Sequence, residues 1–265
     1  MPYFIISLDT ELSYGYHLYP ESKMARMLRK KEHEAINSIK GLLELFEKYN
    51  IPATWAVVGR LFLDHPKVIE NILSSPVKHE VGYHSYSHIL FSDCNREIAE
   101  IEIQKGIELA KDFGITFRSF VFPENKIGHI DILKKYNFKV YRGPNLAGKN
   151  VGKILPIRAV NFALSKIVAP PVKFMWKNGI WEIPSSMMFY DPFFPFTLVL
   201  RAKLGITKAI REKKIFHIFV HPEDLYFKPN LINQLEDVLK FVVKKRNKGK
   251  LKVITMGELA SLMMR

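Results

Sequence analysis

The chain has 265 residues, of which 48% are hydrophobic and 25% charged, and its formal net charge is +14. These values are ordinary for a folded globular protein and exclude intrinsic disorder. The one cysteine, Cys94, excludes an internal disulfide and a cysteine-based zinc site. The positive charge favours anionic partners through its long-range field.

Short apolar segments rich in β-branched and aromatic residues alternate with longer segments of helical period. The expected strands are 3–8, 53–58, 80–83, 116–122, 138–141, 179–183, 215–220 and 252–255. The expected helices are 34–49, 97–113, 130–136, 198–211, 231–243 and 256–264. Because parallel neighbours need a crossover, this alternation predicts a parallel sheet, and at this length a closed (β/α)7–8 barrel.

We expect one domain over residues 1–265, with an irregular excursion at 142–178, where glycine and proline interrupt both patterns. The first residues are apolar, but they lack a basic segment, and Asp9 ends the run. No stretch approaches the ~18 apolar residues of a membrane-spanning helix. The expectation is a cytoplasmic protein without a signal peptide or transmembrane segment.

Polar side chains follow the expected strands at their carboxyl ends, where parallel α/β folds carry their sites. The segments concerned are Asp9-Thr10-Glu11, His84-Ser85-Tyr86-Ser87-His88, Pro123-Glu124-Asn125 and His221-Pro222-Glu223-Asp224. Nearly every apolar strand releases a histidine or a carboxylate at the same end. The sequence therefore predicts one polar site at this rim.

Four of these residues predict a metal site. Asp9 and Glu11 face the same side of an extended chain, and such a pair suits a metal ligand beside a general base. His84 and His88 are four residues apart, so on one helical turn both imidazoles could meet one ion. Two histidines and a carboxylate match an open catalytic site, most consistent with Zn²⁺, with Co²⁺ or another divalent ion as alternatives.

A third histidine supplies a general acid. His221 closes the strand at 215–220, whereas His217 lies about 13 Å further from the carboxyl end and is expected to be a core residue. Ser185 follows the strand at 179–183 and is expected at the same rim, in contact with substrate.

Together these residues resemble the NodB-type polysaccharide deacetylases, carbohydrate esterase family 4. The matching segments occur in the family's order: Ser7-Leu8-Asp9-Thr10-Glu11, Ala53-Thr54-Trp55-Ala56-Val57-Val58-Gly59, His84-Ser85-Tyr86-Ser87-His88 and Phe219-Val220-His221. The third of them fits the family's H-(S/T)-x-x-H motif in full. The resemblance implies a distorted (β/α)7 barrel, a divalent metal and hydrolysis of an N-acetyl group on an amino sugar.

The resemblance also implies roles: Asp9 as base, Glu11, His84 and His88 as metal ligands, and His221 as the acid that protonates the departing amine. Common members carry adjacent aspartates in the first motif. Here Thr10 takes the second place, as in D-x-E variants, so an exchange of roles between Asp9 and Glu11 stays open.

The arginine that braces the base in the family has no evident counterpart. Arg118 lies about 13 Å before the end of its strand and is not expected to reach the site. Pro123 and Asn125 are better placed, with Asn125 as a substrate contact. A backbone N–H near Tyr86 or Asn125 is expected to stabilise the oxyanion.

Two other functions remain as alternatives. One is a cyclic amide or imide hydrolase of the same barrel family, similar to allantoinase. The other is a non-enzymatic basic protein that binds nucleic acid or an anionic surface. The charge of +14 and the basic run 244–248 favour this alternative. That run ends a predicted helix, where cations suit the helix dipole, so no specific nucleic acid is expected.

The expected substrate is an amino sugar carried on a lipid or a nucleotide, since no export signal was found. Residues 187–200 are dense in large apolar side chains, with Phe193, Phe194 and Phe196 among them. They pack as core, or they form a surface for peripheral membrane binding or self-association.

Overall fold

The computed structural model describes residues 1–16, 20–145 and 168–264. Its strands are β1 (Tyr3–Thr10), β2 (Thr54–Val57), β3 (Glu80–Tyr83), β4 (Ser119–Val121), β5 (Val140–Asn145), β6 (Met175–Lys177), β7 (Ile180–Ser185), β8 (Met187–Met188), β9 (Ile215–Val220) and β10 (Lys252–Val253). The α-helices are α1 (Lys23–Lys30), α2 (Glu32–Tyr49), α3 (Leu61–Asp64), α4 (Pro66–Ser74), α5 (Arg96–Lys111), α6 (Ile130–Lys135), α8 (Leu198–Glu212), α9 (Pro222–Phe227), α10 (Asn230–Asn247) and α11 (Met256–Met263). Short 3₁₀ turns are η1 (Leu12–Tyr16), η2 (Pro123–Asn125) and η3 (Pro195–Thr197).

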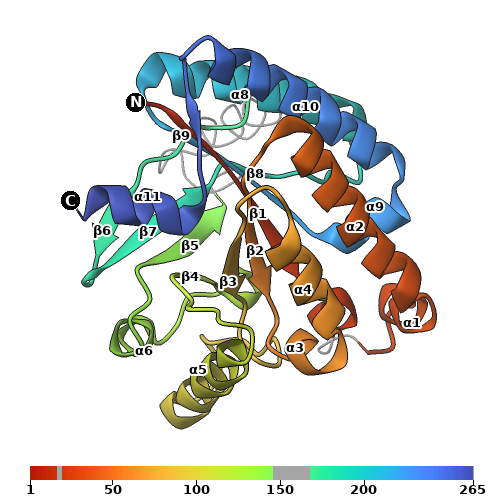
Figure 1. Cartoon of the computed structure of the whole chain (residues 1–265), viewed down its shortest axis with the longest axis vertical. Helices are drawn as coiled ribbons and strands as arrows, with labels where there is room; N and C mark the ends of the chain where they lie inside the picture. Colours follow the sequence, from red (N-terminus) through yellow and green to blue (C-terminus); the bar gives the residue numbers. More distant parts are fainter. Residues whose placement is uncertain (17–19, 146–167, 265) are drawn as a thin grey trace, which may run out of the picture.

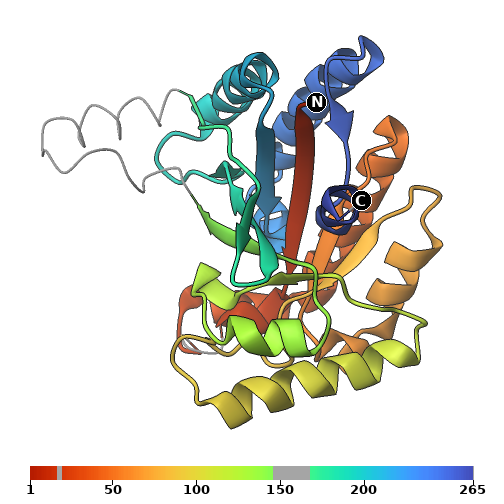
Figure 2. The ribbon, with the colours of Figure 1, turned by 90° about the vertical axis from the view of Figure 1, so that its left-hand side faces the viewer.

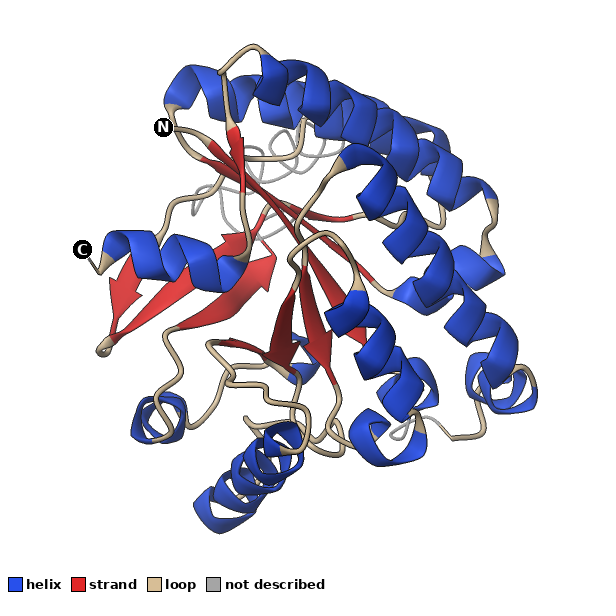
Figure 3. Ribbon diagram, viewed as in Figure 1, coloured by secondary structure: helices blue, strands red, loops and turns tan. Residues whose placement is uncertain are grey.

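The strands form one sheet in the order β6-β7-β5-β4-β3-β2-β1-β9-β8, with β10 beside β1. All these neighbours are parallel except β6 and β7, which form an antiparallel hairpin. Helices surround the strands on the outside (Figure 3). Among the described residues no helix is long and apolar enough to cross a bilayer.

One extended segment joins β7, near one end of this strand order, to β8 at the other end, and it changes its partner at Ser186. On one side of it, Ser185 of β7 pairs with Asn145 of β5, and on the other, Met187 of β8 pairs with Ile218 of β9. The Ser186 N–H donates to the carbonyl oxygen of His217 at 2.7 Å, which fastens the junction to β9. The sheet therefore curves into the distorted (β/α) barrel that the sequence predicts.

The core follows from the sequence pattern. β1 is buried from Phe4 to Thr10 because packed residues cover both of its faces. Helix α2 buries one apolar stripe and ends at Asn50, whose left-handed φ of 48° terminates the helix ahead of Pro52. In α5, Gly106 leaves room for Tyr83, since a Cβ at Gly106 would lie 1.9 Å from the tyrosine ring.

The expected excursion at 142–178 is wrong at both edges. Residues 142–145 belong to β5, and residues 175–177 form β6, because each pairs with β7. Residues 146–167, the middle of the expected excursion, lie outside the described residues.

Candidate active site

The first three strands end at one level and deliver their polar residues to one rim. Thr10 pairs with Val57, and Val57 pairs with Tyr83. Residues that follow these partners, Glu11 and His84 among them, leave the sheet side by side. Figure 2 shows β1 crossing the middle of the molecule.

In the part of the chain that the structure describes, one group of three His, Cys, Asp or Glu side chains is arranged to share an ion. It consists of Glu11, His84 and His88. Their ligand atoms all lie within 4.8 Å of one another, and all three residues are buried. Glu11 Oε2 lies 3.0 Å from His84 Nε2 and 2.9 Å from His88 Nε2. The pKa of Glu11 lies well below its usual range: burial raises it, but the charges of His88 and His221 outweigh that effect.

The surroundings of His84 fit a metal ligand. Its Nδ1 lies 2.7 Å from the Val121 carbonyl oxygen, and because a carbonyl can only accept, Nδ1 carries the ring proton. Its Nε2 faces Glu11 and is the nitrogen available to an ion. A histidine whose second nitrogen is held by a carbonyl is the usual arrangement at metal sites. Two imidazole nitrogens and one carboxylate oxygen thus fit a divalent cation.

The two histidines do not share a helical turn, so that part of the prediction is wrong. The segment from His84 to His88 is a loop in which Ser85 and His88 have φ values of 61° and 62°. Glu102 of α5 holds this loop: its Oε2 accepts the N–H groups of Tyr86 and Ser87, each at 2.9 Å. The strained backbone and its carboxylate brace bring the imidazole rings to 4.9 Å between centroids.

Arg142 braces Asp9, a role for which the sequence showed no counterpart. Its Nη1 and Nη2 donate to Asp9 Oδ1 and Oδ2 at 2.5 and 2.6 Å, and both side chains are buried. Burial raises the pKa of Asp9, but the guanidinium outweighs this and leaves the pKa below its usual range. Arg118, as expected, lies elsewhere and donates to Ser261.

Arg142 could have been found from the sequence. It directly follows the expected strand 138–141, and carboxyl ends of strands were the positions that pointed to the other site residues. Gly143 and Pro144, which follow Arg142, interrupt the strand pattern and predict an excursion instead.

A buried chain of hydrogen bonds runs from the Pro184 carbonyl group through His217 and Ser7 to Arg142. His217 Nδ1 lies 3.2 Å from the Pro184 carbonyl oxygen and so carries the ring proton. Its Nε2 accepts from Ser7 Oγ at 2.9 Å, which leaves the serine oxygen to accept from Arg142 at 3.3 Å. Burial lowers the pKa of His217 to about 3, so the ring is neutral and belongs to the core, as expected.

His221 faces both carboxylates of the first motif. Its Nε2 lies 3.6 Å from Asp9 Oδ2 and 3.8 Å from Glu11 Oε1, and its Nδ1 lies 3.4 Å from Asp224 Oδ2. Burial lowers the pKa of His221, but Glu11, Asp224 and Asp9 together raise it to about 10. The ring is therefore protonated at neutral pH and can donate a proton.

The N–H groups of Tyr86 and Asn125 themselves are not free to stabilise an oxyanion, and a donor near them stays a prediction. The Tyr86 N–H donates to Glu102, and the Asn125 N–H donates to the Phe122 carbonyl oxygen at 2.9 Å, so both are already used. The side-chain oxygen of Asn125 accepts from Arg142 Nε at 3.1 Å. Pro123 and Ser185 are buried at the ends of β4 and β7, and their contact with substrate stays a prediction.

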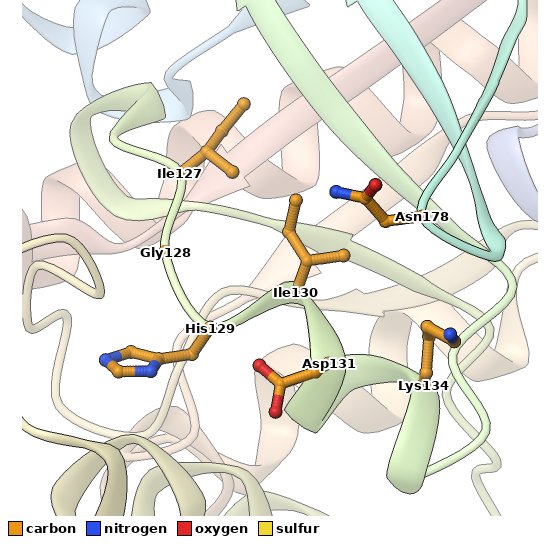
Figure 4. A pocket seen from close by; sticks show the side chains of 7 residues that line it. All are labelled: Ile127, Gly128, His129, Ile130, Asp131, Lys134 and Asn178. Carbon is orange, nitrogen blue, oxygen red and sulfur yellow. The ribbon is translucent and has the colours of Figure 1, made fainter.

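A hollow of about 530 Å³ lies apart from these residues, between the start of α6 and the turn that joins β6 to β7 (Figure 4). It is lined by Ile127, Gly128, His129, Ile130, Asp131, Lys134 and Asn178. None of the site residues above contributes to it.

Part of the chain is similar in sequence to known proteins. Residues 36–141 match the family described as polysaccharide deacetylase. A peptidoglycan deacetylase from Helicobacter pylori is 34% identical over 101 residues, which is 37% of this chain and 34% of that protein. This match thus spans about a third of the relative's length.

Solved structures extend the likeness of fold to nearly the whole chain. A structure named as a polysaccharide deacetylase, from Mycobacterium smegmatis, has a TM-score of 0.75 at 14% identity, with 98% of this chain and 89% of that chain covered. A PuuE allantoinase has a TM-score of 0.70 at 13% identity, with 98% and 89% covered. These structures confirm the barrel fold, and the resemblance to the deacetylase family is carried by residues 36–141.

Proposed function

We propose that this chain, in which residues 36–141 belong to the polysaccharide deacetylase family, is a metal-dependent hydrolase that removes an N-acetyl or similar N-acyl group from an amino sugar of a glycan or glycan precursor. The observation that supports this best is the buried group of Glu11, His84 and His88 beside the pair of Asp9 and His221. A non-enzymatic binding protein would have no need to gather these five groups, four of them buried, at one place.

Glu11, His84 and His88 would hold the ion, with Zn²⁺ expected from the donor set. A bound divalent ion supplies a water of lowered pKa and polarises the amide carbonyl. Asp9, ionised and held by Arg142, accepts the proton of the attacking water. His221, protonated and 3.6 Å from Asp9, donates a proton to the departing amine.

The net charge of +14 suits an amino sugar on a phosphate-bearing carrier, lipid-linked or nucleotide-linked. A ring-opening amide hydrolase is the second candidate, since the fold is shared with an allantoinase. The substrate assay therefore needs both classes of amide.

The test measures acetate released from N-acetylglucosamine oligosaccharides and ring opening of allantoin, after loading the protein with Zn²⁺. We expect acetate release only, and none from the double variant His84→Ala/His88→Ala, which should also bind no metal by mass spectrometry of the eluted ion. The exposed His33→Ala is the matched control and should keep both properties. Equal metal content in the double variant would refute the metal site, and allantoin turnover without acetate would favour the second candidate.

A further inference from the structure

The segment after β8 exposes large apolar side chains that a monomer would ordinarily bury. The exposed fraction is 78% for Phe193, 49% for Phe194 and 73% for Phe196. Leu200 and Leu204 on the solvent face of α8 are 57% and 37% exposed. We call these five residues the apolar patch. Met187, Phe189 and Leu198 are fully buried, so the core interpretation holds for these residues of the segment.

A buried ion pair fixes the shape of this segment. Asp191 Oδ1 accepts the N–H groups of Phe193 and Phe194, both at 3.0 Å, and its Oδ2 pairs with Arg201 at 3.1 Å. The carboxylate and the guanidinium are both buried. The backbone is thus held in a turn that points the phenylalanines outward, so their exposure is built into the fold.

The surroundings of the patch are cationic. Between residues 189 and 211 the only acid in the sequence, Asp191, is buried and paired with the buried Arg201. Lys203, Lys208 and Arg211 remain, and Arg211 lies 3.9 Å from Glu212. Lys203, Lys208 and Arg211 flank or continue the helix face that carries Leu200 and Leu204, at steps of three and four residues. Helix α8 lies in the outer layer beside α10 (Figure 1), where this face is open to solvent.

We propose that the apolar patch docks on the surface of an anionic lipid bilayer. Exposed phenylalanine and leucine with flanking lysine and arginine is the composition of a segment that inserts shallowly at a membrane interface. A second copy of the chain fits less well, because a self-complementary contact would bring the cationic flanks of the two copies together.

The position of the patch gives this docking a consequence for the site. Tyr190, next to Asp191, lies under Lys228 at 4.6 Å, and Lys228 ends helix α9, which begins directly after His221. The patch therefore continues into the rim that carries His221. A docked protein would hold this rim near the membrane surface. The proposal concerns binding and does not depend on the proposed activity.

The test is flotation of the full chain with vesicles of phosphatidylcholine alone or with 30% phosphatidylglycerol. We expect binding to the anionic vesicles, weakened at least tenfold in Phe193→Ser/Phe194→Ser/Phe196→Ser and in Lys203→Glu/Lys208→Glu. The double variant Leu63→Ser/Leu73→Ser removes exposed leucines from α3 and α4 and should bind like the parent. The midpoint of thermal unfolding should be the same in every variant as in the parent. If the triple variant does not fold, the single variant Phe193→Ser takes its place.

Three results would overturn the proposal. In the first, the folded triple variant binds vesicles as well as the parent protein does. In the second, the parent protein binds no vesicles. In the third, the parent protein is a dimer in light scattering, the triple variant is not, and neither protein binds vesicles.

Discussion

Arg142 of β5 donates two hydrogen bonds to Asp9 of β1, a residue 133 positions earlier in the chain, and neither side chain meets solvent. A fork of two parallel N–H groups fixes the carboxylate in orientation as well as in charge. The pair links the base of the proposed reaction to a strand on another side of the barrel.

Replacing Arg142 by alanine should therefore destabilise the protein and impair turnover together. An unpaired buried carboxylate costs about 3–5 kcal/mol, and a displaced base costs ~10²-fold in kcat. Urea unfolding and acetate release measure the two effects. Arg118→Ala, which removes only an exposed contact with Ser261, is the control and should change neither. Wild-type stability in Arg142→Ala would contradict the brace.

Substitution of Asp9 and of Glu11 should have different effects on metal binding and on turnover. Asp9→Asn should keep the metal and lose turnover, whereas Glu11→Gln should lose the metal, because Glu11 alone belongs to the group of ligands. His221→Ala should cost ~10²–10⁴-fold in kcat through loss of the general acid. Metal content and acetate release of each variant decide the assignment. Metal loss in Asp9→Asn with retention in Glu11→Gln would mean that the roles are exchanged.

Glu102 should control metal affinity without touching the ion. Its carboxylate holds the loop between the two histidines through Tyr86 and Ser87. Glu102→Ala should weaken Zn²⁺ binding about 10–100-fold, the usual loss for a residue that orients ligands. Competition with a chromophoric chelator measures this loss. Glu108→Ala, an exposed change on the same helix, should bind zinc normally, and equal affinities in both variants would count against the brace.

His79 should make the protein less stable in mild acid. Burial lowers its pKa to about 4, below the ordinary 6.5 of an unfolded chain, and its Nδ1 accepts the Ala53 N–H. Between these two values the unfolded state binds more protons, so stability falls as pH drops from 6.5 towards 4. The loss between pH 7 and pH 5 should be about 1–2 kcal/mol after allowance for partial exposure. In His79→Gln the free energy of unfolding in urea should no longer fall by this amount between pH 7 and pH 5. An unchanged pH dependence would show that other groups cause it.

The sequence was sufficient where the evidence is local. Strands 80–83 and 215–220 were predicted with the bounds that the structure has, because a strand's apolar run and its polar end are written in consecutive residues. The same reasoning placed Asp9, Glu11, His84, His88 and His221 at one rim, since parallel strands end at the same side. These five residues carry the proposed chemistry, and their placement at one rim required no knowledge of the strand order.

Only the tertiary structure decided which distant groups meet. The pairing of Arg142 with Asp9 depends on how the barrel closes, and it closes through a change of partner at Ser186 that no local pattern marks. The brace from Glu102 depends on the close approach of α5 to β3 at Gly106. Likewise, Met187 and Phe193 are equally apolar in sequence, yet one is buried and the other is 78% exposed. Periodicity reports that a side chain is apolar, whereas burial and pairing depend on the surfaces that folding brings to it, often from more than a hundred residues away.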